Sequence, residues 1–255
     1  MKRRLLPAIL LVALLGGLMS CEKTEQYPSD QLTDYFVMEP GKTITYRLDS
    51  LIFINFGQKD TTISYQAKDV VDASYTDQAG QPAWRVIRYL RDLESTDDKD
   101  WQVDMSYQVK FSGKHVELLE DNLTYRKLQL PITMGFSWQG NNLLPTNPFR
   151  VRYQFSNDND IRSWDYMYDE VGGTEIINNK PYEDVVTVFQ AGDSVNVPVI
   201  IPNAIGYKDH WVEKYAKNIG LVYKEVVLWE YQPANGTTPS FRAGFGIRMS
   251  ILDHN

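Results

Sequence analysis

Histidines, the side chains that most often carry acid–base and metal chemistry, are few in this chain of 255 residues. His115, His210 and His254 are scattered, and His254 is the penultimate residue. A histidine-based zinc site needs clustered ligands, such as two histidines on one turn of a helix. The sequence therefore predicts neither a metal site nor a bound cofactor.

Ser137 lies in a segment that comes close to a nucleophile motif. The run Gly135-Phe136-Ser137-Trp138-Gln139 lacks the last glycine of the G-x-S-x-G nucleophile elbow, and no helical pattern follows it. The sequence also lacks a glycine-rich loop of the kind that holds phosphate groups. We therefore predict no catalytic residue and expect a protein that is not an enzyme.

Two groups of oxygen-bearing side chains could do chemistry. Glu213 and Glu225 could face each other across a hairpin and act as general acid and base, although a solvated sheet face explains them more simply. Asn157-Asp158-Asn159-Asp160 offers oxygen ligands for calcium, but it lacks the glycine and the closing glutamate of the twelve-residue loop. We expect a hairpin turn there, between Phe155 and Trp164.

Cys21 is the only cysteine, and it ends a characteristic leader. Basic residues at positions 2–4 precede an apolar run over residues 5–15, which is the layout of a secretory signal peptide. The run is shorter than the roughly 20 apolar residues that a membrane-spanning helix needs. Leu18-Met19-Ser20-Cys21 resembles the lipobox of bacterial lipoproteins. The resemblance implies cleavage of residues 1–20 and acylation of Cys21.

The predicted lipid anchor also predicts where the protein resides. Each buried methylene contributes about 0.8 kcal/mol, so two or three acyl chains on one cysteine anchor far more firmly than one. The polar residues 21–34 are expected to form a flexible tether. We expect a protein of the bacterial cell envelope that contacts the membrane, expected to be the outer membrane, only through acyl chains on Cys21. The sequence leaves open which side of the membrane the domain faces.

Charge excludes two classes of partner. The chain has 26 basic and 33 acidic side chains, a net charge of −7, and removal of the leader changes this to −10. Nucleic-acid binding requires a basic stripe, so no nucleic-acid partner is expected. Attraction of the protein surface to anionic lipid is excluded on the same grounds.

The elements that must position these residues are mostly strands. From residue 43 to residue 251, short runs that alternate apolar and polar side chains are separated by turn residues. Residues 149–155 form one such run. No stretch keeps a 3.6-residue apolar period. We predict a single all-β, mainly antiparallel domain over residues 35–255, a meander-type sandwich or half-barrel with at most one or two short helices.

Residues 207–217 admit two interpretations. They could form a helix, or Trp211, Glu213 and Tyr215 could line one face of a strand. In the second case the chain turns at Asn218-Ile219-Gly220, with the glycine at positive φ. We favour the hairpin, because the segments on both sides have the pattern of strands.

Three longer segments carry a family resemblance. Tyr35–Tyr46 resembles the opening of lipoproteins from Bacteroidota-type bacteria, in which a Pro-Gly turn precedes the first long strand. Leu130–Asn141 resembles their middle corner, and Tyr215–Glu225 resembles their late hairpin. The resemblance implies a β-rich domain and no established activity. The expected architecture is also similar to that of periplasmic half-barrels that hold acyl chains.

The aromatic residues leave three functions open. The 16 tyrosines, 10 phenylalanines and 6 tryptophans are core by default, but they could also line a cavity between sheet and loops. We expect first a non-catalytic structural or interaction protein with unknown protein partners. The alternative is a carrier of a lipid, another apolar ligand or a glycan, and an envelope hydrolase comes third.

Overall fold

The computed structural model describes residues 30–156 and 160–255, so the leader and Cys21 lie outside the described residues. Twelve strands make up most of the described chain, and no helix in it reaches seven residues. The strands are β1 (Thr43–Ile54), β2 (Lys59–Thr76), β3 (Pro82–Asp92), β4 (Gln102–Ser112), β5 (His115–Glu120), β6 (Leu123–Gln129), β7 (Ser137–Trp138), β8 (Tyr166–Ile177), β9 (Lys180–Val195), β10 (Gly206–Ala216), β11 (Gly220–Gln232) and β12 (Phe241–His254). The short helical turns are α2 (Leu32–Tyr35), η2 (Asp98–Asp100), α3 (Arg150–Tyr153) and η3 (Ile161–Ser163).

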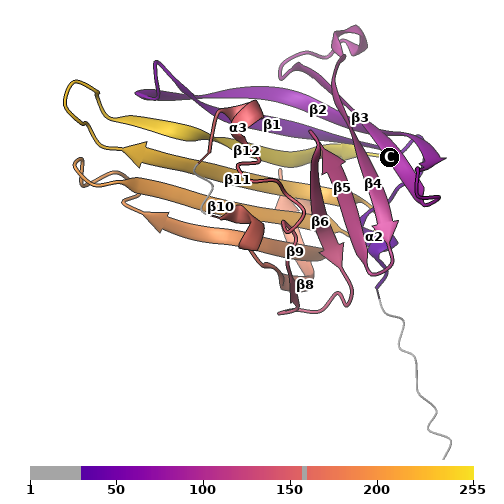
Figure 1. The fold of residues 1–255 in the computed structure, drawn as a ribbon. Coiled ribbons are helices and arrows are strands. Elements are labelled where there is room, and N and C mark those ends of the chain that lie inside the picture. The colour runs from indigo at the N-terminus through magenta and orange to yellow at the C-terminus, as the bar shows by residue number, and fades with distance from the viewer. Residues whose placement is uncertain (1–29, 157–159) are drawn as a thin grey trace, which may run out of the picture.

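All twelve strands belong to one antiparallel sheet. Its order is β6-β5-β4-β3-β2-β1-β12-β11-β10-β9-β8-β7. Strands that are consecutive in sequence therefore pair with each other, except that β6 and β7 form the two edges of the sheet, and β1 also pairs with β12. Figure 1 shows the sheet curling until β4–β6 stand across from β8–β11. The prediction of an all-β meander is confirmed. Of the two architectures that the sequence left open, the nearly closed half-barrel is correct.

The two ends of the sheet meet through individual hydrogen bonds instead of a continuous ladder. The amide of Arg126 donates to the carbonyl of Gly140 at 2.9 Å, and Trp138 Nε1 donates to the carbonyl of Arg126 at 2.8 Å. The hydroxyl of Tyr168 donates to the carbonyl of Gln129 at 2.8 Å. These bonds join β6 to β7 and β8, and they give the sheet an enclosed interior.

Residues 207–217, for which the sequence allowed a helix or a strand, lie almost entirely in strand β10. In β10 the side chains of Trp211, Glu213 and Tyr215 are all buried and share the inward face, as period-2 alternation requires. The chain turns after Ala216, and Gly220 has φ +112°, so the predicted hairpin is confirmed.

The strand that we expected over residues 149–155 is wrong. The region contains α3, and Phe149 and Phe155 are buried while Val151 is 95% exposed. The described parts of residues 139–165, which we call the cover segment, cross the concave face of the sheet. Leu144, Phe149, Phe155 and Ile161 of this segment are buried by packing on the interior, without a strand partner.

The α2 end of the half-barrel is closed by the start of the described chain. Leu32 and Tyr35 are buried, and Phe36 packs on Tyr215 with 5.4 Å between ring centroids. Lys217, in the β10–β11 turn, forms an ion pair with Asp30. The described chain is therefore already packed on the domain before residue 35. Among the residues that the structure describes, no helix has the length and apolar character needed to cross a membrane.

Candidate functional site

Glu213 lies at the centre of the interior and is 1% exposed. Lys127 Nζ donates to Glu213 Oε1 at 2.7 Å, and Trp211 Nε1 donates to the same oxygen at 3.0 Å. The hydroxyl of Tyr215 donates to Oε2 at 2.6 Å. Strand alternation supplies Trp211 and Tyr215 from β10 itself, whereas Lys127 comes from β6, at the other end of the sheet. Both carboxylate oxygens therefore have donors.

These contacts hold Glu213 as an anion. Burial alone would raise its pKa, but the charges of Lys127 and Lys224, together with hydrogen bonds from Lys127 and Tyr215, lower the pKa to about 2. Burial lowers the pKa of Lys127, and the attraction of Glu213 offsets part of that effect. A carboxyl group with such a low pKa is poorly suited to act as a general acid near neutral pH.

A second ion pair lies on the opposite wall. Arg88 Nε and Nη2 donate to the two carboxylate oxygens of Asp69, each at 2.7 Å, and the hydroxyl of Tyr107 donates to Asp69 Oδ2 at 2.9 Å. Arg88 Nη1 also lies 3.5 Å from Glu120 Oε1. Burial alone would lower the pKa of Arg88, but the attraction of Asp69 outweighs burial and raises it. This planar, two-bonded arrangement is the strong form of an arginine–carboxylate pair.

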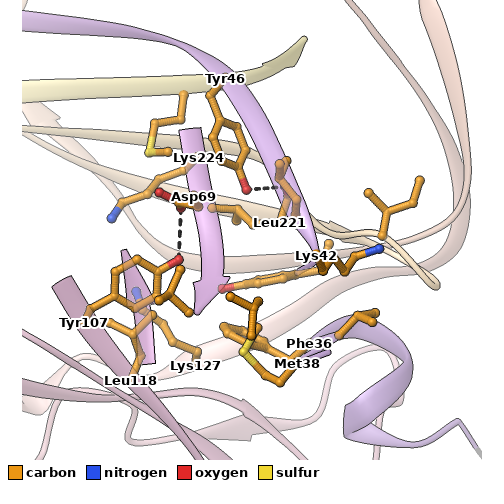
Figure 2. Close-up of a pocket in the computed structure, with 18 of the residues that line it drawn as sticks. Phe36, Met38, Lys42, Tyr46, Asp69, Tyr107, Leu118, Lys127, Leu221 and Lys224 are labelled. Carbon is orange, nitrogen blue, oxygen red and sulfur yellow. Dashed lines mark hydrogen bonds between the residues drawn. The ribbon is translucent and has the colours of Figure 1, made fainter. Parts of the chain in front are cut away.

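Lys224 completes a group that we call the interior ion cluster. Among the described residues its ammonium group has no hydrogen bond and no ion pair, and it lies 5.8 Å from the centroid of the Trp211 ring. In Figure 2 the side chains of Lys224, Asp69, Lys127 and Tyr107 gather on one side of the pocket. The cluster consists of Asp69, Arg88, Glu120, Lys127, Glu213 and Lys224.

The interior ion cluster lies between two cavities. The inner cavity, of about 70 Å³, lies towards α2 and is shown in Figure 2. The outer cavity, of about 520 Å³, lies between the sheet and the cover segment. Arg88, Glu120, Lys127 and Lys224 line both cavities.

The walls of both cavities are mainly apolar away from the cluster. Aliphatic and aromatic residues of the inner wall include Phe36, Met38, Val71, Val86, Leu118, Leu221 and Met249. Those of the outer wall include Leu48, Leu90, Leu123, Tyr125, Phe149, Tyr153, Trp211, Val226, Phe245, Ile247 and Met249. The outer volume falls within the range of roughly 300–1,000 Å³ that small-molecule sites occupy.

The cover segment is fixed to both walls of the outer cavity. The Tyr153 ring stacks on Phe245 of β12, with centroids 3.7 Å apart, and Phe149 meets the same ring edge-on at 5.1 Å. On the other side, Arg152 pairs with Asp121 in the β5–β6 turn at 2.6 Å. The outer cavity is thus bounded by a one-turn helix with contacts on both sides.

The two glutamates that could have formed an acid–base pair lie on opposite faces of the sheet. The register places Lys224, not Glu225, opposite Glu213. Glu213 is therefore in the interior and is buried, so the expectation of a solvated sheet face is wrong for this residue. Glu225 is outside, where it pairs with Arg248 at 2.8 Å and lies 3.5 Å from His210.

The other candidates for chemistry are also separated. His115 contacts Glu117 at 3.0 Å, His254 ends β12, and Ser137 is exposed on β7. Residues 157–159 of the calcium candidate lie outside the described residues. In the described part of the chain, no group of three or more His, Cys, Asp or Glu side chains could hold a metal ion.

The cations of the interior ion cluster were not among the residues that we predicted from the sequence. One signal was available for Arg88, which lies two residues after Val86 and therefore on the same apolar face of β3. Lys127 likewise lies two residues after the buried Tyr125, but the alternation along β6 is broken at Leu128, which is also buried, and the pairing of β5 with β6 is irregular between Val116 and Glu117.

Comparisons with known proteins leave the function open. No family model and no curated protein matches the sequence. A Bacteroides fragilis protein with a YmcC-like fold matches at 13% identity and a TM-score of 0.30, over 84% of this chain and 97% of that one. LprF from Mycobacterium bovis matches at 7% identity and a TM-score of 0.23, over 87% of this chain and 89% of that one. A Vibrio parahaemolyticus structure described as an outer membrane lipoprotein-sorting protein domain matches at 10% identity and a TM-score of 0.22, over 84% of this chain and 85% of that one. Matches at such low TM-scores support no statement about function.

Proposed function

We propose that this domain binds an elongated apolar ligand in its outer cavity and does not catalyse a reaction. The observation that carries the proposal is the cavity itself, about 520 Å³ of space inside the half-barrel with a mainly aliphatic and aromatic wall. Transfer of one methylene group from water to such a wall is favourable by about 0.8 kcal/mol. A chain of methylene groups is therefore the ligand that gains most from this site.

The polar end of the ligand is expected at Lys224. Arg88 and Lys127 already have carboxylate partners, whereas the ammonium group of Lys224 has none among the described residues. Lys224 is half-buried beside the cavity, and a ligand oxygen that accepts a hydrogen bond from its charged ammonium group stabilises the complex. We therefore propose an apolar chain that ends in acceptor oxygens.

This proposal changes the order of the functions that the sequence left open. The apolar wall favours an acyl-type ligand over a glycan, because a sugar would leave hydroxyl groups facing aliphatic side chains. Glu213, which could have served in catalysis, already has a donor on each carboxylate oxygen and has a low pKa. We retain anchorage in the cell envelope through acyl groups on Cys21 as part of the proposal, on the strength of the leader sequence.

A fluorescence titration tests the proposal. The protein is residues 21–255 with Cys21→Ser, and the probe is cis-parinaric acid, whose emission rises in apolar surroundings. We expect saturable binding by the parent protein. Ile247→Trp, which fills the outer cavity from β12, should weaken binding by about tenfold or more, equivalent to about 1.4 kcal/mol.

Two further variants make the result specific. Val103→Trp adds the same side chain to β4 at a position that is 66% exposed and outside the cavity wall, so its affinity should equal that of the parent. Lys224→Met should weaken binding of the acid by about tenfold, the effect of losing one hydrogen bond to a charged group. A parent protein that leaves the probe unbound, or equal affinities for the parent and Ile247→Trp, would overturn the proposal.

A further inference from the structure

The end of the half-barrel opposite α2 carries three turns at the same level. These are the β1–β2 turn at residues 55–58, the β9–β10 loop at residues 196–205 and the β11–β12 loop at residues 233–240. Gly206 pairs with Tyr231, Tyr231 pairs with Arg242, and the amide of Arg242 donates to the carbonyl of Gly57 at 2.8 Å. Figure 1 shows the three turns together at the left end of the sheet.

The β9–β10 loop exposes an unusual concentration of apolar side chains. Five of them form what we call the apolar tip: Val195, Val197, Ile200, Ile201 and Ile205, which are 46, 38, 76, 56 and 61% exposed. No charged residue lies between Asp193 and Lys208. In the neighbouring β1–β2 turn, Phe56 is 92% exposed. Contiguous exposed apolar groups of this kind mark interaction sites.

Several backbone groups of the loop are bonded from within. The side chain of Asn196 accepts hydrogen bonds from the amides of Ile200 and Ile201, each at 3.0 Å. Its amide group donates to the carbonyls of Ile201, Ala204 and Ile205 at 3.0, 3.4 and 3.5 Å. The side chain of one asparagine thus bonds to two amides of the loop and shares its two N–H donors among three nearby carbonyls.

Two prolines reduce the number of polar groups further. Pro198 and Pro202 have no amide hydrogen, and the carbonyl of Pro202 accepts from the hydroxyl of Tyr231 at 3.0 Å. A loop that enters hydrocarbon must satisfy its backbone internally, because no water is available there. A loop that docks on another protein has no such requirement, since its partner can supply the hydrogen bonds.

From these observations we infer that the apolar tip inserts into the surface of a lipid bilayer. The loop is convex and uncharged, and several of its backbone groups are bonded internally, which suits the boundary between headgroups and acyl chains. The attraction is apolar, so it is compatible with the acidity of the protein, which opposes binding to anionic lipid by charge. This contact is additional to the predicted anchor at Cys21. It stands independently of ligand binding in the cavity.

Flotation with vesicles tests the inference. Residues 21–255 with Cys21→Ser lack both the leader and the acyl groups but keep every described residue. This parent protein is floated with vesicles of zwitterionic phosphatidylcholine. We expect the parent to float with the vesicles, and we expect Ile200→Asn/Ile201→Asn to reduce the ratio of bound to free protein by about tenfold or more.

The chain offers a matched control at the opposite end of the sheet. Ile176, in β8 next to the β8–β9 turn, is 73% exposed, so Ile176→Asn removes a similar exposed side chain far from the tip. Its vesicle binding should equal that of the parent, and unfolding curves should show that all three proteins are folded. The inference is overturned if the parent remains unbound or if the double variant floats as the parent does.

Discussion

At the scale of single residues, the pair of Lys127 and Glu213 determines the geometry of the interior. The two residues are on β6 and β10, which belong to different halves of the sheet, and their 2.7 Å contact fixes the distance between two walls. An ionised carboxylate is costly in an apolar interior unless it is paired and hydrogen-bonded. Trp211 and Tyr215 provide the remaining hydrogen bonds. The pair therefore keeps the cavities open at a defined width.

The low pKa of Glu213 predicts a loss of stability in acid. Its folded pKa is about 2 and its ordinary value is 4.5, so the stabilisation is complete above about pH 5 and is lost as the pH falls towards 2. The difference corresponds to on the order of 3 kcal/mol in the free energy of unfolding. Urea unfolding at several pH values between 6 and 2 measures it.

The control for this prediction is the double variant Lys127→Met/Glu213→Gln. It removes both charges and keeps a side chain that can bond to Trp211 and Tyr215, so no buried charge loses its partner. Other carboxylates still titrate in this variant, and only the contribution of Glu213 disappears. Parallel curves of stability against pH for the parent and the double variant would contradict the prediction.

The sequence indicates only part of this arrangement. Alternation along β10 places Glu213 on the same face as Trp211 and Tyr215, so one half of the pair could be predicted. Lys127 could not, because its partner is 86 positions away and the pairing depends on how the sheet closes. Contacts across a curved sheet depend on its curvature, and a strand pattern does not encode that quantity.

At the scale of elements, the β1–β2 turn depends on close contact with β12. Asn55, Phe56 and Gly57 all have positive φ, at 51°, 55° and 78°. A Cβ atom on Gly57 would lie 2.2 Å from the carbonyl oxygen of Arg242. Glycine is thus required here by the backbone conformation and also by the approach of a neighbouring strand.

A comparison of two glycines separates these requirements. Gly80 has φ +76°, almost the value of Gly57, but a Cβ atom there would meet nothing within 4 Å. Gly80→Ala should cost about 1 kcal/mol from the left-handed conformation alone. Gly57→Ala should cost at least about 1 kcal/mol more in the free energy of unfolding, because the collision adds to the strain. If urea unfolding shows that both variants lose the same free energy of unfolding, the neighbouring strand β12 accommodates the added methyl group without cost, and the prediction is wrong.

The cover segment contains the element that the sequence pattern failed to predict. Residues 149–155 resemble the strands around them in composition, and α3 has only four residues. A one-turn helix gives no 3.6-residue period that could be detected. Its position follows from the burial of Phe149 and Phe155 against Phe245, which are long-range contacts.

At the scale of the whole molecule, the half-barrel has two different ends. The α2 end contains the start of the described chain and the inner cavity, and the other end carries the apolar tip. Strand β10 runs between them over 11 residues, or about 33 Å. The alternating strands predicted the meander, but not its closure, since a sandwich would have the same local pattern. The two cavities follow from closure and were therefore only an expectation from the sequence.

The orientation of the molecule on its membrane depends on Cys21. The described chain begins at the α2 end, so the predicted anchor at Cys21 and the apolar tip are separate attachments. Cys21→Ser in the full chain should leave a protein that carbonate washing removes from the membrane, because only the weaker contact of the apolar tip remains. The physical reason is that two or three acyl chains, at about 0.8 kcal/mol per methylene, bind far more strongly than five exposed aliphatic side chains. Carbonate washing followed by immunodetection measures the distribution, and Glu22→Gln, which leaves Leu18-Met19-Ser20-Cys21 intact, should remain with the membrane. If the Cys21→Ser protein is still bound after washing, the acyl groups are not what makes the attachment resistant to washing, and the prediction is wrong.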